Sequence, residues 1–303
     1  MAEMKVLVDK TGGFSIIQEQ FKQQVFQDSI RKYFDMDEEG NLIVTSGASI
    51  ELIPSKPMKI KGCIGSCHSH KTKTDNCSKE VVGEGETDKW YVGGLDHNFS
   101  LTFIMEVDNN NTKDPKQLAY IQLLTQYKHP CGNIRLRVTT ISRSYVHTFQ
   151  QSQIIQGMDQ QAIIATFAKL AANKSQELDS SVVIRWLDRN LIFLMAKFAK
   201  YQKGANAEES FSMPDEISII PQFFYYLRKS WFVRTFASSL DESVYYRLVV
   251  SRDNVSNVLT MIQPCITQYD LESEQPSPVI CDIESMQDSV ILLMDCYFFV
   301  GIW

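Results

Sequence analysis

Residues 219–247 have the sequence IIPQFFYYLRKSWFVRTFASSLDESVYYR, which places nine aromatic side chains within a short span. Apolar residues recur there at steps of three or four: Phe223, Leu227, Trp231 or Phe232, and Phe236. This spacing predicts a helix with one apolar face. We therefore expect most of the rings to lie in a helical core, with Arg228, Lys229 and Arg234 facing solvent.

Helical periodicity extends over residues 151–272, which we predict to form an all-α domain. Asp159 precedes an apolar stripe and could cap the helix that carries it. A second helix is expected from Ser180 to a stop at Gly204, and a third from Asp241 to about Arg252. The seam of the second helix would be formed by Ile184, Leu187, Leu191, Leu194 and Phe198. On that helix, Asp188 lies close enough to Arg185 and Arg189 for ordinary ion pairing.

Residues 39–150 show a period of two, interrupted by glycine and proline turns. In NIRLRVTTI, Ile134, Leu136 and Val138 fall on one face of a strand and the intervening residues on the other. Several such strands within about 100 residues predict an antiparallel β-sandwich.

The two ends of the chain differ from this pattern. Residues 1–38 begin with a short apolar strand at VLVD and continue as a helix whose apolar stripe runs from Ile17 to Phe34. One strand and one helix cannot bury such a stripe, so we expect the remnant of a larger domain. Residues 273–303 return to strand-like sequence and end on an apolar run, as a domain cut short would.

Composition narrows the functional classes. The chain has 303 residues, 44% of them hydrophobic and 22% charged, which indicates a folded protein of more than one domain. A net charge of −6 argues against attraction of the whole surface to nucleic acid or anionic lipid. No secretory signal is evident, no apolar run reaches about 18 residues, and seven scattered cysteines fit free thiols in a reducing compartment.

The segment GCIGSCHSHKTKTDNC, residues 62–77, offers the strongest alternative. Its thiols and imidazoles are the side chains that zinc prefers, and they predict a zinc-binding interaction module with ligands drawn from Cys63, Cys67, His68 and Cys77. However, no second matched cysteine pair follows at the usual spacing, so we favour a turn that carries ordinary thiols over a metal site. No nucleophile elbow or phosphate loop is present, which argues against an enzyme.

A second alternative arises from YLRKSWFVR, where basic and aromatic residues alternate as in some nucleic-acid-binding proteins. We favour packing of these rings in the helical core. Arg228 and Lys229, on its solvent side, are the residues that we expect to meet a protein partner.

Ten motifs, collinear over nearly the whole chain, resemble the Sec-twenty-three family, the GTPase-activating inner-coat subunits of COPII vesicles. They are TGGF, GCIG, GEGETDKW, TQY with IRLRVTTISR, MDQQAIIATFAKLA, VIRWLDRNLIFLMAKFAKYQK, PQFFYYLRKSWF, DESVYYR, MIQPCITQY and VILLMDCYFF. The related cargo-adaptor subunit, Sec-twenty-four, shares the architecture and is the main alternative within the family.

The resemblance implies a multidomain α+β fold. Residues 1–38 would be the end of a von Willebrand-like trunk, 39–150 the β-sandwich, 151–272 the helical domain, and 273–303 the start of a truncated gelsolin-like domain. The family's zinc finger would precede residue 1, so no cofactor is expected in this chain. Its catalytic arginine finger would lie beyond residue 303, so the fragment is expected to be inactive as a GTPase activator.

The resemblance also implies the partners. They would be the small GTPase Sar, the Sec-twenty-four subunit and outer-coat proteins, with no nucleic acid. The protein would be cytoplasmic and peripheral at endoplasmic reticulum exit sites, acting in transport to the Golgi.

Overall fold

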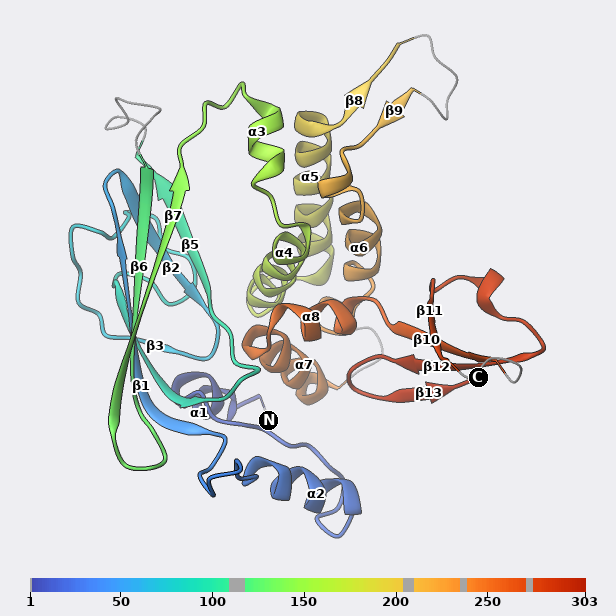
Figure 1. Cartoon of the computed structure of the whole chain (residues 1–303), viewed down its shortest axis with the longest axis horizontal. Helices are drawn as coiled ribbons and strands as arrows, with labels where there is room; N and C mark the ends of the chain where they lie inside the picture. The colour runs from blue at the N-terminus through green and yellow to red at the C-terminus, as the bar shows by residue number, and fades with distance from the viewer. Residues whose placement is uncertain (1, 109–117, 204–209, 235–238, 271–274) are drawn as a thin grey trace. The chain divides into compact units, whose positions relative to one another are not determined.

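The computed structural model describes residues 2–108, 118–203, 210–234, 239–270 and 275–303 (Figure 1). Their contacts divide the chain into two compact units. Unit 1 comprises residues 1–150 and 238–252, and unit 2 comprises residues 151–237 and 253–303. Unit 1 contains a β-sandwich and unit 2 contains a helical bundle and a small sheet, so the predicted multidomain α+β class is confirmed.

The sandwich of unit 1 consists of two antiparallel layers. The larger has the strand order β3-β4-β1-β6-β7, formed by β3 (His68–Ser69), β4 (Lys89–Leu95), β1 (Thr45–Pro54), β6 (Leu118–Lys128) and β7 (Ile134–Ser144). The smaller pairs β2 (Met58–Ile64) with β5 (Thr102–Val107). The period-two pattern thus predicted this architecture correctly.

The core of the sandwich is centred on Trp90, whose side chain is fully buried. Its ring lies 5.1 Å from that of Phe103 and packs with inward-facing residues of both layers: Ala48, Ile50, Leu52, Ile60, Cys63, Cys67 and Val92. A buried indole N–H needs an acceptor, and Trp90 Nε1 donates to the Glu84 carbonyl at 2.8 Å. Core packing and the hydrogen bond therefore both hold the Trp90 side chain in one position.

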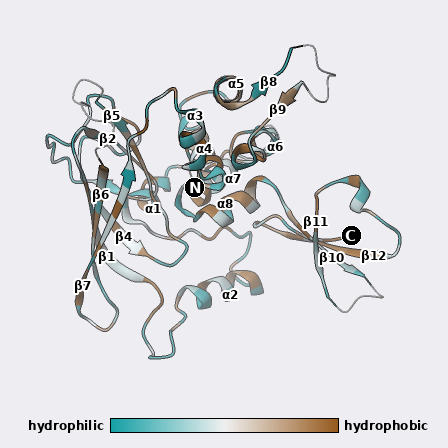
Figure 2. Ribbon diagram, turned by 45° about the horizontal axis from the view of Figure 1, so that its top comes forward, coloured by the Kyte–Doolittle hydropathy of each residue, from teal (hydrophilic) through white to brown (hydrophobic). Residues whose placement is uncertain are grey.

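Strand β7 is formed as predicted, but neither of its faces is buried among the described residues. Ile134, Leu136 and Val138 are 70%, 61% and 51% exposed. Figure 2 shows hydrophobic and hydrophilic residues interspersed along this strand, which pairs with β6 and is the last strand of the sheet in the described part of the chain. The alternation of apolar and polar residues predicted the position of the strand correctly, but it did not predict that the apolar face would be exposed.

The predicted strand at the beginning of the chain is wrong. Residues Lys5–Thr11 form helix α1, which ends at Gly12 in the left-handed conformation (φ +64°). The following helix, α2 (Gln24–Tyr33), is shorter than predicted, and Phe21 is 78% exposed before it. Docking of α1 on β4 overrides the strand preference of Val6–Val8, because tertiary contacts outweigh local propensity in so short a segment.

Helix α7 (Leu240–Arg252) was predicted correctly, yet it groups with unit 1. The Ala2 amide donates to the Asp241 carboxylate at 3.0 Å, and Arg252 pairs with Asp96 at 2.5 Å. The Arg252 guanidinium also lies 5.6 Å from the centre of the Phe99 ring. This helix therefore joins the unit that contains the sandwich, although its sequence position lies within the predicted helical range.

The helices of unit 2 are α3 (Gln151–Gln156), α4 (Gln160–Lys174), α5 (Ser180–Phe198), α6 (Ile220–Leu227) and α8 (Val255–Ile262). Asp159 caps α4 as predicted, accepting from the Ala162 amide at 3.1 Å. Helix α5 ends at Phe198 rather than at Gly204, which lies outside the described residues. The chain continues as β8 (Lys200–Tyr201), paired with β9 (Phe211–Ser212). None of the described helices combines the length and the apolar character that a membrane crossing requires.

The aromatic segment of residues 219–247 is only partly core. Phe224 and Phe232 are buried, as is Leu227, whereas Tyr225 and Trp231 are each 51% exposed. Phe223, predicted to lead the apolar stripe, is half-buried, and Phe236 lies outside the described residues. Helix α6 is shorter than the predicted stripe and turns its Phe224 side inward, which leaves some of the rings on the surface.

Unit 2 also contains a four-stranded antiparallel sheet of order β11-β10-β12-β13. The strands are β11 (Ser277–Val279), β10 (Cys265–Asp270), β12 (Val290–Asp295) and β13 (Val300–Ile302). Strand β10 precedes residue 273, so this sheet begins within the range that the sequence assigned to the helical domain. Short 3-10 helices occur at Asp215–Ile217 and Ile283–Ser285.

The contact between α1 and β4 predicts the effect of one added methyl group. A Cβ atom at Gly93 would lie 1.7 Å from the Thr11 carbonyl oxygen, so Gly93→Ala must displace α1. We expect a loss of about 1–3 kcal/mol in the free energy of unfolding, measured by urea denaturation, with faster amide exchange in α1. Gly157→Ala is the control, because its Cβ would meet only ordinary contacts from 3.5 Å outward. Equal effects of the two substitutions would contradict the close packing.

Candidate functional site

The cysteine and histidine segment does not form a metal site in the structure. Cys63 and Cys67 are buried in the sandwich core, 0% and 1% exposed. Cys77 is half-buried beside Thr74, and His68 is exposed. Throughout the described part of the chain, no group of three His, Cys, Asp or Glu side chains is arranged to hold a metal ion. Strand β2 turns the Cys63 thiol into the core, whereas the His68 side chain is exposed, so the segment does not present its thiols and imidazole to one site.

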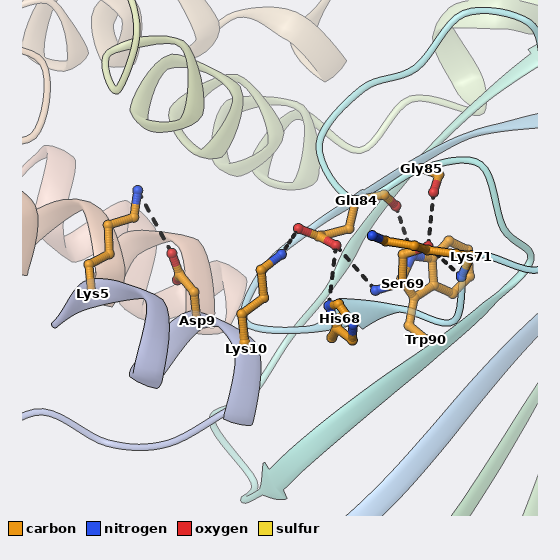
Figure 3. Close-up of polar contacts among 9 residues, drawn as sticks. All are labelled: Lys5, Asp9, Lys10, His68, Ser69, Lys71, Glu84, Gly85 and Trp90. Carbon is orange, nitrogen blue, oxygen red and sulfur yellow. Dashed lines mark hydrogen bonds and ion pairs between the residues drawn. The ribbon is translucent and has the colours of Figure 1, made fainter. Parts of the chain in front are cut away.

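The same segment is instead organised around Glu84 (Figure 3). Its carboxylate accepts a hydrogen bond from the Ser69 amide at 3.1 Å and pairs with the Lys10 ammonium. The His68 Nδ1 atom lies 3.9 Å from the same carboxylate. The network connects α1, β3 and the segment before β4, which indicates a scaffolding role. The motif GEGET gives no sign of this role in the sequence, because the partners of the Glu84 carboxylate are distant along the chain.

Two further contacts extend this network. The Ser69 hydroxyl donates to the Gly85 carbonyl at 3.0 Å and accepts from the Lys71 amide at 3.0 Å. On α1, burial raises the pKa of Asp9, although the Lys5 ammonium 3.8 Å away opposes that rise. These groups are all engaged within unit 1.

The predicted partner-binding residues Arg228 and Lys229 lie just after α6. The Arg228 guanidinium is 3.1 Å from the Asp188 carboxylate of α5, so it links two helices of the bundle. The Lys229 ammonium lies 3.9 Å above the Tyr225 ring and donates to its hydroxyl, which lowers the pKa of Tyr225. Lys229 is the more exposed of the two cations.

The expected ion pairs within α5 are not formed. Asp188 pairs with Arg228, while Arg185 Nε donates to the Ser181 carbonyl at 3.2 Å. The prediction of ion pairs within α5 was wrong because spacing along one helix identifies only partners on that helix. Arg228, the actual partner of Asp188, lies forty positions further along the chain. This leaves the outward cations of α5 without the acidic partner that the sequence suggested.

Comparisons with known proteins match two segments of the chain to described domain families. A family model described as the Sec23/Sec24 beta-sandwich domain matches residues 45–146, and one described as the Sec23/Sec24 helical domain matches residues 159–260. The chain belongs to the Sec23/Sec24 family of COPII coat subunits. Protein transport protein SEC23 C of Arabidopsis thaliana is 38% identical over 98% of the chain, and SEC23 F of the same plant is 36% identical over 100%.

The chain spans 39% of the length of each of these two relatives. The crystal structure of the human COPII-coat protein Sec24c has the same fold, with a TM-score of 0.73 at 16% identity. That similarity covers 96% of this chain and 35% of Sec24c. The family resemblance inferred from the ten motifs is therefore confirmed.

The positions of the thiols predict the metal content. We expect elemental analysis of the purified chain to find far less than one zinc per molecule, because Cys63 and Cys67 are enclosed by apolar side chains. Cys131, which is exposed, should react with a thiol reagent much faster than either of them in the folded protein. One zinc per chain, lost in the variant Cys67→Ser, would revive the zinc-module hypothesis.

Proposed function

We propose that this chain is the β-sandwich and helical part of a Sec23-type coat subunit that acts in transport from the endoplasmic reticulum to the Golgi. The observation that carries the proposal is identity of 36–38% with two SEC23 proteins over essentially the whole chain. That similarity favours the Sec23 type over the cargo adaptor. The partners would be the Sar GTPase, a Sec24-type subunit and outer-coat proteins, at endoplasmic reticulum exit sites.

The residues of the chain support an assembly role better than a catalytic one. An arginine finger accelerates GTP hydrolysis by placing a guanidinium against the charge that develops on the transferred phosphoryl group. Residues 253–303, which include the sheet of unit 2, contain neither arginine nor lysine. We therefore propose that this chain provides docking surfaces, and that GTPase activation requires an arginine supplied by other sequence.

This division of roles predicts the result of a GTPase assay. In single-turnover measurements with GTP-loaded Sar, the chain should leave the hydrolysis rate unchanged, while a longer Sec23 protein in the same assay should raise it by roughly 10³-fold or more. The longer protein serves as the positive control. A clear acceleration by the chain itself would refute the proposal of a purely docking role.

Binding measurements test the proposed partners directly. We expect the immobilised chain to bind at least one of Sar carrying a nonhydrolysable GTP analogue, a Sec24-type subunit, or an outer-coat protein. Lys229→Glu should weaken that binding by about threefold, because reversing a charge at the rim of an interface slows association. Lys22→Glu, at an exposed lysine of unit 1, should have no effect. Absence of binding to all three partners would contradict the proposed function.

A further inference from the structure

A groove lies in unit 2 beside the end of α4 and the first half of α5, with a volume of about 360 Å³. These two helices run side by side in Figure 1. The groove is lined by three apolar and three basic side chains, namely Leu178, Val182, Trp186, Lys174, Arg185 and Arg189. No acidic residue is among them, so the groove combines an apolar surface with one sign of charge.

The Trp186 ring is held in place by the core. It lies 5.6 Å from the Phe167 ring, which in turn lies 5.0 Å from the buried Phe224 ring. The Lys174 ammonium lies 5.2 Å from the centre of the Trp186 ring. A ring supported in this way is a preorganised wall, and binding against it requires little loss of side-chain freedom.

The cations of the groove are not neutralised by the protein. Among the described residues, no carboxylate lies within ion-pair distance of Lys174, Arg185 or Arg189, and the nearest acid along α5, Asp188, is paired with Arg228. Residues 151–252 contain twelve basic and ten acidic residues, whereas residues 253–303 contain eight acidic and no basic ones. The chain's negative charge therefore arises elsewhere, and the groove remains locally positive.

The outward face of α5 continues the apolar surface. Phe193 is 68% exposed and follows Arg189 by four positions and Trp186 by seven, which places all three on one side of the helix. Ile192 beside it is 66% exposed. The groove thus opens onto an elongated face long enough for several residues of an extended or helical ligand.

We propose that this groove binds an acidic peptide segment of a partner protein. One aromatic or aliphatic side chain of the peptide packs against Trp186, between Leu178 and Val182. Aspartate or glutamate residues on either side pair with Arg185, Arg189 and Lys174, where arginine can bind a carboxylate through two hydrogen bonds. A concave apolar pocket rimmed by cations fits a peptide better than a flat lipid surface, and the proposal is independent of the coat partners named above.

The test uses fluorescence anisotropy with the whole chain and a short fluorescein-labelled peptide of Glu and Asp residues around one Phe and one Leu. Binding should weaken with added salt, because charges at an exposed groove are screened over about 8 Å at physiological ionic strength. Arg189→Glu should weaken binding about tenfold, as should Trp186→Ala. Lys203→Glu, an exposed lysine outside the groove, should change it less than about twofold.

Two control peptides and a check of folding complete the experiment. A peptide with Lys in place of every acid, and one with Ser in place of Phe and Leu, should both fail to bind. Circular dichroism should show that Arg189→Glu remains folded, so that a loss of binding is assigned to the groove. The proposal is overturned if Arg189→Glu binds the acidic peptide as the unaltered chain does. It is also overturned if the groove variants lose binding only to phosphatidylserine vesicles, or lose only self-association of the chain.

Discussion

The burial of Trp90 is the constraint on which the arrangement of unit 1 depends. Its indole N–H can leave water only by finding an acceptor, and the Glu84 carbonyl provides it. The Glu84 carboxylate then holds Ser69 and Lys10, so a single residue connects the core to β3 and α1. Glycine makes this close approach possible: at Gly62 (φ +149°) a Cβ atom would lie 2.2 Å from the Val82 carbonyl oxygen.

The sequence predicted those elements whose pattern repeats several times. Period-two alternation located the sandwich strands, and the apolar seam of α5 and the Asp159 cap located two helices. The errors fall where a single long-range contact decides the outcome. Residues 5–11 look like a strand, but they become a helix against β4, and α5 ends at Phe198 where the chain enters β8. The local sequence pattern predicts neither the packing of α1 against β4 nor the pairing of β8 with β9.

The candidate site was harder to predict for the same reason. Cys63, Cys67 and His68 are close in sequence, yet both thiols are buried in the sandwich core while the imidazole is exposed. Asp188 was predicted to form ion pairs with its neighbours on the same helix, whereas its partner in the structure is Arg228, just after α6. That one pairing accounts for two observations: Arg228 is partly engaged within the bundle, and the outward cations of α5 are left for other contacts.

The distribution of charge supports the proposed assembly role. The eight acidic residues of the segment 253–303 have no basic residue among them, while the face of α5 displays arginines beside the exposed Ile192 and Phe193 side chains. Separate surfaces of opposite charge orient partners during encounter and discourage incorrect ones, because like charges brought together cost several kcal/mol. Such contacts are individually weak and sensitive to salt. A coat that must both assemble and come apart is well served by many contacts of this kind, and the exposed side chains of this chain are of the type that makes them.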